Sequence, residues 1–110
     1  MARQKIINVH GHLRQGCDLA ALVREWEKQG VVKFCVLALG KQWQQKGYLG
    51  NDEVLKASRQ FPDIIAALGH VELGGPFRDR AEKVEQLKEQ GFCGLKFISP
   101  EAPYSDERYF

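Results

Sequence analysis

The stretch Val31-Val32-Lys33-Phe34-Cys35-Val36-Leu37-Ala38-Leu39 is apolar at nearly every position. A strand with one face in water alternates apolar and polar residues, whereas a near-continuous apolar run is typical of a strand that is covered on both faces. Strands of that kind belong mainly to parallel sheets flanked by helices. This run therefore predicts a strand of a parallel sheet in an α/β protein.

Three further apolar runs of strand length occupy residues 5–9, 64–68 and 94–98. Amphipathic helical patterns separate the four runs, at residues 19–29, 51–60 and 77–90. Asp18 and Asn51 are the candidate N-caps, and Gly30 and Gly91 follow the last turns of the first and third helices. Strands and helices are therefore expected to alternate along the whole chain.

This alternation predicts right-handed βαβ crossovers within one domain, residues 1–110. The successive units begin at residues 5, 31, 64 and about 92, so they are 26, 33 and 28 residues long. A (β/α)8 TIM barrel of about 250 residues uses about 31 residues per unit. We therefore expect an α/β fold of (β/α)8 TIM-barrel type in which the first four units form a half-barrel, and a natural reading frame that continues past Phe110.

The composition excludes several classes of function. Charged residues make up 27% of the chain and the net charge is +2, without a basic stripe, so a nucleic-acid partner is not expected. No apolar run approaches the length of a membrane span or of a secretory signal, which predicts a cytoplasmic protein without a membrane partner. The three cysteines lack metal-binding spacing and are expected to be reduced, buried and apolar in role.

The first strand ends in His10-Gly11-His12. Alternation along a strand places Asn8, His10 and His12 on one face, so the two imidazoles converge. Their ring nitrogens can approach one ion at the roughly 2.0 to 2.1 Å of a Zn–N bond, which predicts a divalent metal, zinc before others. Gly11 is expected to leave room for the metal or for a substrate. The alternative is a pair of solvated histidines without a function.

Other side chains are expected at the same end of the sheet, where barrels gather their functional residues. Lys96 interrupts the apolar fourth strand and is the candidate catalytic residue; a solvated ammonium at the rim is the alternative. His70, at the end of the third run, is a candidate for contact with substrate; a polar residue that simply ends the strand is the alternative. Arg14 has the planar fork that binds a carboxylate, and Trp43 in the loop at residues 40–50 could hold a small-molecule substrate that is anionic or aromatic.

The chain contains the segments Ile6-Ile7-Asn8-Val9-His10-Gly11-His12-Leu13, Asn51-Asp52, Phe61-Pro62-Asp63 and Gly91-Phe92-Cys93-Gly94-Leu95-Lys96-Phe97-Ile98-Ser99-Pro100. These four segments resemble the amidohydrolase-related branch of the metal-dependent amidohydrolase superfamily. The resemblance covers essentially the whole chain. It implies a barrel with one or two divalent metals that hydrolyses amide or ester-like bonds, with His10 and His12 as ligands. Lys96 would lie at the metal-bearing rim, carbamylated in two-metal members. The family more often has Asp where Asn8 stands.

The family also takes histidines from its fifth and sixth strands and a catalytic aspartate from its eighth, so the 110-residue chain alone is expected to have little activity. Two alternatives to a hydrolase remain open. One is a decarboxylase or hydratase of the same superfamily. The other is a metal-free half-barrel module that associates with a second copy, because the fourth strand, at residues 94–98, would form an uncovered apolar edge that promotes self-association.

Overall fold

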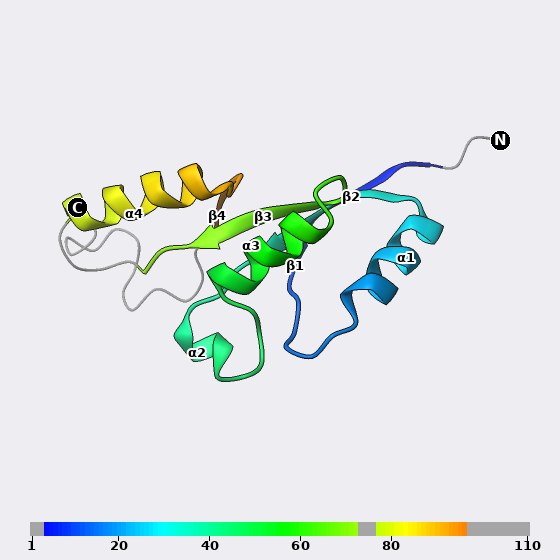
Figure 1. Ribbon diagram of the computed structural model, residues 1–110, viewed down its shortest axis with the longest axis horizontal. Helices are drawn as coiled ribbons and strands as arrows, with labels where there is room; N and C mark the ends of the chain where they lie inside the picture. The colour runs from blue at the N-terminus through cyan, green and yellow to red at the C-terminus, as the bar shows by residue number, and fades with distance from the viewer. Residues whose placement is uncertain (1–3, 73–76, 97–110) are drawn as a thin grey trace.

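The computed structural model describes residues 4–72 and 77–96 of the protein. Its elements follow one another as β1 (Ile6–Gly11), α1 (Leu19–Gln29), β2 (Val31–Leu37), α2 (Lys41–Gln44), α3 (Asn51–Gln60), β3 (Ile65–His70), α4 (Phe77–Gln90) and β4 (Gly94–Lys96) (Figure 1). The strands form one parallel sheet in the order β1-β2-β3-β4. This curled parallel sheet confirms the predicted α/β class and the predicted alternation of strands and helices, and it is consistent with part of an α/β barrel.

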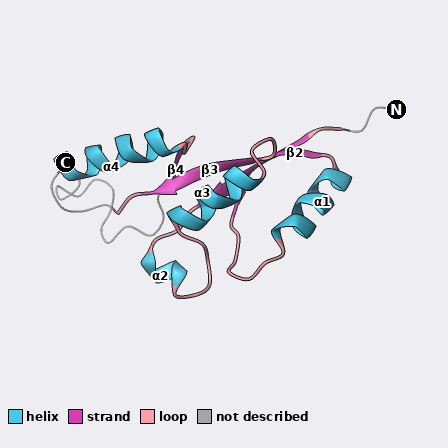
Figure 2. Ribbon diagram, viewed as in Figure 1, coloured by secondary structure: helices cyan, strands magenta, loops and turns pink. Residues whose placement is uncertain are grey.

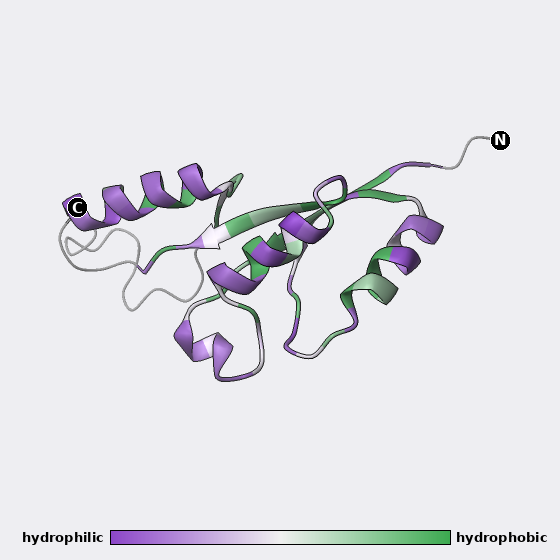
Figure 3. Ribbon diagram, viewed as in Figure 1, coloured by the Kyte–Doolittle hydropathy of each residue, from purple (hydrophilic) through white to green (hydrophobic). Residues whose placement is uncertain are grey.

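The core lies between the sheet and the helices that connect its strands (Figure 2). One cluster of buried side chains joins Val23 of α1, Val54 of α3 and Leu87 of α4 to strand residues such as Val36 and Ala67. The strands are mainly hydrophobic along their length, whereas α4 is mainly hydrophilic (Figure 3). The helices therefore pack on the face of the sheet that carries Val36 and Ala67.

Helix α1 has the boundaries that its sequence predicts. The Asp18 side chain accepts a hydrogen bond from the backbone N–H of Ala21 (3.1 Å), which satisfies one of the unpaired donors at the helix start. Gly30 ends the helix with a φ of 89°, in the left-handed region that a residue without Cβ adopts at little cost. These two residues fix where α1 begins and ends, and so where β2 can start.

Trp26 anchors α1 to the sheet. Its ring stacks on Phe34 of β2 with 4.1 Å between the ring centroids and 11° between the planes. Both residues pack against the buried core cluster. Trp26 is therefore a packing residue.

The element boundaries differ from the prediction at several points. The loop at residues 40–50 contains the short helix α2, and β3 extends to His70, two residues beyond the predicted end. The predicted strand positions 97–98, like the tail at 99–110, lie outside the described residues. Within the described residues, none of the helices has the length and apolar character needed to cross a membrane.

The prediction of buried cysteines is wrong for two of the three. All are free thiols, as expected, but Cys17 and Cys93 are exposed and Cys35 is only partly covered. Cys17 lies in the loop before α1, and Cys93 immediately precedes β4 at one edge of the sheet. An apolar neighbourhood in the sequence does not bury a residue at an edge, because coverage there depends on a neighbouring element.

Candidate metal centre

The end of β1 is irregular, and this irregularity orients its side chains. Asn8 pairs with Phe34 and Gly11 pairs with Val36, so three steps along β1 match two along β2. One extra residue therefore lies between them, as in a β-bulge. The side-chain oxygen of Asn8 accepts a hydrogen bond from the backbone N–H of His10 (2.9 Å), which stabilises the irregular segment locally. The predicted shared face of Asn8, His10 and His12 is wrong, because the bulge moves Asn8 to the face of Phe34.

His10 and His12 bring their imidazoles together. Their Nε2 atoms lie 3.1 Å apart, and the rings are nearly perpendicular, at 85°. Two nitrogens bonded to one zinc ion would be about 2.9 to 3.4 Å apart for bond angles between 90° and tetrahedral. The donor types and their spacing therefore fit a divalent metal of the zinc type.

His12 is held in the tautomer that a metal ligand needs. Its Nδ1 donates a hydrogen bond to the backbone carbonyl of Leu37 (3.3 Å). Because Nδ1 carries the proton, Nε2 keeps its lone pair and faces His10. A backbone carbonyl in this position is a common outer partner of metal-binding histidines.

Burial lowers the pKa of His12 below its usual 6.5, and the nearby charges of His10 and Lys96 lower it further. The hydrogen bond to the carbonyl of Leu37 acts in the opposite direction and raises this pKa. The net effect favours a neutral imidazole. A neutral ring can donate its lone pair to a cation without first releasing a proton.

Gly11 is required for packing and not for space at the metal, so the sequence interpretation of this residue is wrong. It lies on the face opposite the histidines, and a Cβ built on it would overlap the ring of Phe34. The ring of Phe34 is itself held by Trp26. Glycine therefore lets β1 pass close to β2 while the flanking histidines turn the other way.

Lys96 shares a face of the sheet with His70, because these two residues are register partners in β3 and β4. The Lys96 side chain is partly exposed. Its positive charge lowers the pKa of His12, which follows directly after β1 at the other side of the sheet. The structure therefore brings Lys96 into electrostatic range of His12, at the same end of the sheet.

His70 is enclosed more fully than a simple rim residue. Its side chain is 13% exposed, and its Nε2 lies 3.2 Å from Oε1 of Glu72. Gly40 packs directly over this pair, since a Cβ there would lie 2.7 Å from Nε2 of His70 and 2.8 Å from the Glu72 oxygen. The pair lines a cleft of about 360 Å3 that also includes Lys41 and Lys83. His70 therefore lines a separate cleft, whose lining residues include neither His10 nor His12.

Arg14 and Trp43 are both engaged within the loops at this end of the sheet. Arg14 donates to the hydroxyl of Tyr48 (3.3 Å) and to the backbone carbonyl of Lys46 (3.0 Å). The Lys46 ammonium lies 4.6 Å from the centroid of the Trp43 ring, and Trp43 also meets the edge of Tyr48. Contact of Arg14 or Trp43 with a substrate stays a prediction, and their observed partners lie within the chain.

The structure adds Tyr48 to the neighbourhood of the histidines. Its ring lies 6.1 Å from that of His12, in an edge-to-face arrangement at 74°. The sequence assigns it no role, because nothing in the spacing of Tyr48 indicates which strand end it meets.

Within residues 4–72 and 77–96, no group of three or more His, Cys, Asp or Glu side chains could hold a metal ion.

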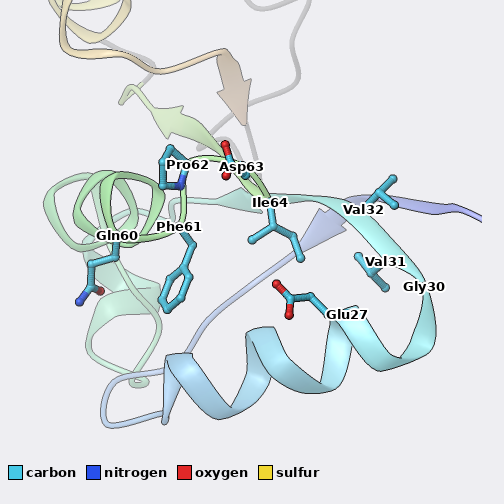
Figure 4. A pocket seen from close by; sticks show the side chains of 9 residues that line it. All are labelled: Glu27, Gly30, Val31, Val32, Gln60, Phe61, Pro62, Asp63 and Ile64. Carbon is cyan, nitrogen blue, oxygen red and sulfur yellow. The ribbon is translucent and has the colours of Figure 1, made fainter.

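Another cavity lies away from the histidines. Its volume is about 460 Å3, and it opens where β2 and β3 begin, with Glu27, Val31, Phe61 and Ile64 among its lining residues (Figure 4). The histidines and Lys96 lie at the opposite ends of the strands, where β1 and β4 finish. This cavity is therefore separate from the candidate centre.

Comparisons of the chain with protein-family models, with curated proteins and with solved structures found no match. The geometry of the chain's own residues is therefore what indicates a function.

Proposed function

We propose that the protein is a metal-dependent hydrolase of the amidohydrolase type, and that its sheet is part of a (β/α)8 barrel. The observation that carries the proposal is the 3.1 Å separation of the Nε2 atoms of His10 and His12, with Nδ1 of His12 bound to a backbone carbonyl. Two histidines held in this way supply two neighbouring corners of a metal's coordination sphere. The other ligands would come from other strands of the barrel.

Each residue would contribute through a property that the geometry supports. A bound divalent ion would supply Lewis acidity and activate water for attack on an amide or ester-like bond. His10 must carry its own proton on Nδ1 for its Nε2 to bind the ion, whereas His12 already has that tautomer. Lys96 would attract an anionic group of the small-molecule substrate, or carry a carbamate, at the same rim.

The direct test is metal binding. Zn2+ binding is measured by equilibrium dialysis on the wild-type chain and on the variants His10→Ala, His12→Ala and His70→Ala. We expect saturable binding by the wild type, at least about tenfold weaker binding after loss of either His10 or His12, and wild-type binding by the His70 variant, which serves as the control. Equal Zn2+ binding by the wild type and His10→Ala would contradict the proposal.

A second candidate function is supported by the surface of β1. Ile6, Ile7 and Val9 are 43%, 62% and 67% exposed, and β1 lies at an edge of the sheet. Exposed apolar residues on an unpaired edge strand favour pairing with another strand. A metal-free module that associates with a second copy through this edge is therefore the alternative to the hydrolase. Zn2+ binding that depends on His10 separates the two.

A further inference from the structure

We infer that Tyr48 is a positioning residue for His12: its ring, fixed by Arg14 on one side, holds the imidazole so that Nε2 faces His10. The inference deepens the proposed function, and its metal-binding consequence rests on that function. It concerns a residue that belongs to neither β1 nor β2 but to the segment between α2 and α3.

The first step is the pairing of two loops. The backbone N–H of Gln15 donates to the carbonyl of Gly47 (2.7 Å), and that of Leu49 donates to the carbonyl of Leu13 (3.2 Å). Between these bonds, Arg14 and Tyr48 form an antiparallel bridge. The segment that follows β1 is therefore fastened to the segment that precedes α3. This pairing sets Tyr48 beside the end of β1 independently of any metal.

The second step is the restraint on the Tyr48 ring. The Arg14 guanidinium carbon lies 4.7 Å from the ring centroid, and an N–H of the same group donates to the Tyr48 hydroxyl (3.3 Å). A second N–H of Arg14 is held by the carbonyl of Lys46 (3.0 Å). A guanidinium anchored in this way limits rotation of the ring, because movement would separate the cation from the aromatic face.

The third step is the contact between Tyr48 and His12. The two rings meet edge to face, with 6.1 Å between centroids and 74° between planes. The bond from Nδ1 of His12 to the carbonyl of Leu37 restrains the imidazole from a different direction. Two restraints from different elements fix both the position and the rotation of the ring. Nε2 is then left aimed at His10.

The experiment uses four variants of the full chain. Tyr48→Ala removes the ring, and Tyr48→Phe keeps the ring without the hydroxyl. Arg14→Met keeps Tyr48 but removes the guanidinium that restrains its ring. Lys46→Ala is the matched control, because it alters the same loop but leaves the backbone carbonyl that Arg14 uses. Two readouts are taken: the tautomer of His12 from the 15N shifts of its ring, and the affinity and visible spectrum of added Co2+.

We expect the wild-type His12 to be protonated on Nδ1 at about pH 8, where imidazole is neutral. Tyr48→Ala should show a mixture of tautomers, about 10-fold to 100-fold weaker Co2+ binding and an altered Co2+ spectrum, the loss typical of an outer partner of a ligand. Tyr48→Phe should stay close to the wild type, Arg14→Met should change in the direction of Tyr48→Ala, and Lys46→Ala should match the wild type.

The inference is overturned if Tyr48→Ala retains the wild-type tautomer, or if Lys46→Ala changes as much as Tyr48→Ala. If Tyr48→Ala does not fold, Arg14→Met decides in its place by the same readouts. A wild-type chain that binds no Co2+ contradicts the proposed function instead, and the tautomer in the metal-free chain then decides the inference by itself.

Discussion

The side-chain amide of Asn51 forms two hydrogen bonds with the backbone of His70. Its nitrogen donates to the His70 carbonyl (2.9 Å), and its oxygen accepts from the His70 N–H (2.7 Å). The first residue of α3 is thereby fastened to the last residue of β3. This contact orders the end of β3, where His70 is the register partner of Lys96 on β4.

Replacement of Asn51 by alanine should therefore destabilise the protein. The variant leaves two partly buried backbone groups without their partner, at a cost of about 1 to 3 kcal/mol. Thermal unfolding should shift downward by about 4 to 8 °C per kcal/mol for a domain of this size. Gln42→Ala, at an exposed position on α2, is the control and should stay within about 0.5 kcal/mol of the wild type. Equal melting temperatures for the two variants would contradict the role given to Asn51.

Gly11→Ala tests the packing of β1 against β2. The added methyl group would overlap the ring of Phe34, which is held in its stack by Trp26, so we expect a loss of about 1 to 3 kcal/mol in urea denaturation. Gly94→Ala is the control, because its Cβ would lie an ordinary 3.6 Å from Leu68. Combining Gly11→Ala with Phe34→Leu should recover part of the loss. No recovery would mean that the overlap is not the cause.

Local signals predicted much of the fold. The capping residue Asp18, the terminal Gly30 and the apolar spacing between them locate α1, because these features act within a few residues. The same reasoning predicts the bounds of α3 correctly, but its assignment of Asn51 as the N-cap is wrong. Gly50 is the N-cap there, without a side-chain hydrogen bond, and Asn51 binds the distant His70 instead. An Asn at a helix start has the same local signature in both cases.

The candidate site was only partly predictable for a similar reason. The spacing of His10 and His12 indicates that two imidazoles can meet, and their Nε2 atoms do lie within contact distance. The bulge in β1 and the position of Tyr48 depend on pairing with β2 and with a loop more than 30 residues away. Such long-range pairing has no periodic pattern in one sequence, so neither feature could be read from it.

The lowered pKa of His12 makes the stability of the protein depend on pH. Below its usual pKa of 6.5, the unfolded chain takes up a proton at this ring while the folded chain still resists it. The free energy of unfolding should therefore fall as the pH drops from about 7 through 6.5 and toward the lower folded pKa. Urea denaturation across this range should show a weaker decline in His12→Gln. The same decline in both proteins would show that His12 does not cause it.

Lys96→Met should raise the pKa of His12, because it removes a positive charge that disfavours the protonated ring. An NMR titration of the His12 imidazole measures this shift directly, and it should be largest at low ionic strength. Lys56→Met, on the exposed side of α3, is the matched control and should leave the His12 titration unchanged. An unchanged His12 pKa in Lys96→Met would mean that the ammonium lies too far away to act on the metal site.

Charged substitutions on β1 test whether its exposed edge joins a second copy. Ile7 and Val9 are 62% and 67% exposed, and burying such a side chain contributes about 1.5 to 3 kcal/mol. Ile7→Lys or Val9→Lys should therefore weaken self-association about tenfold or more, measured by sedimentation equilibrium over a range of concentrations. Ala20→Lys, at an exposed position on α1, is the control and should associate like the wild type. A wild-type chain that stays monomeric at every concentration would exclude the self-associating module. The metal site formed by His10 and His12 would then be the remaining proposal for the function.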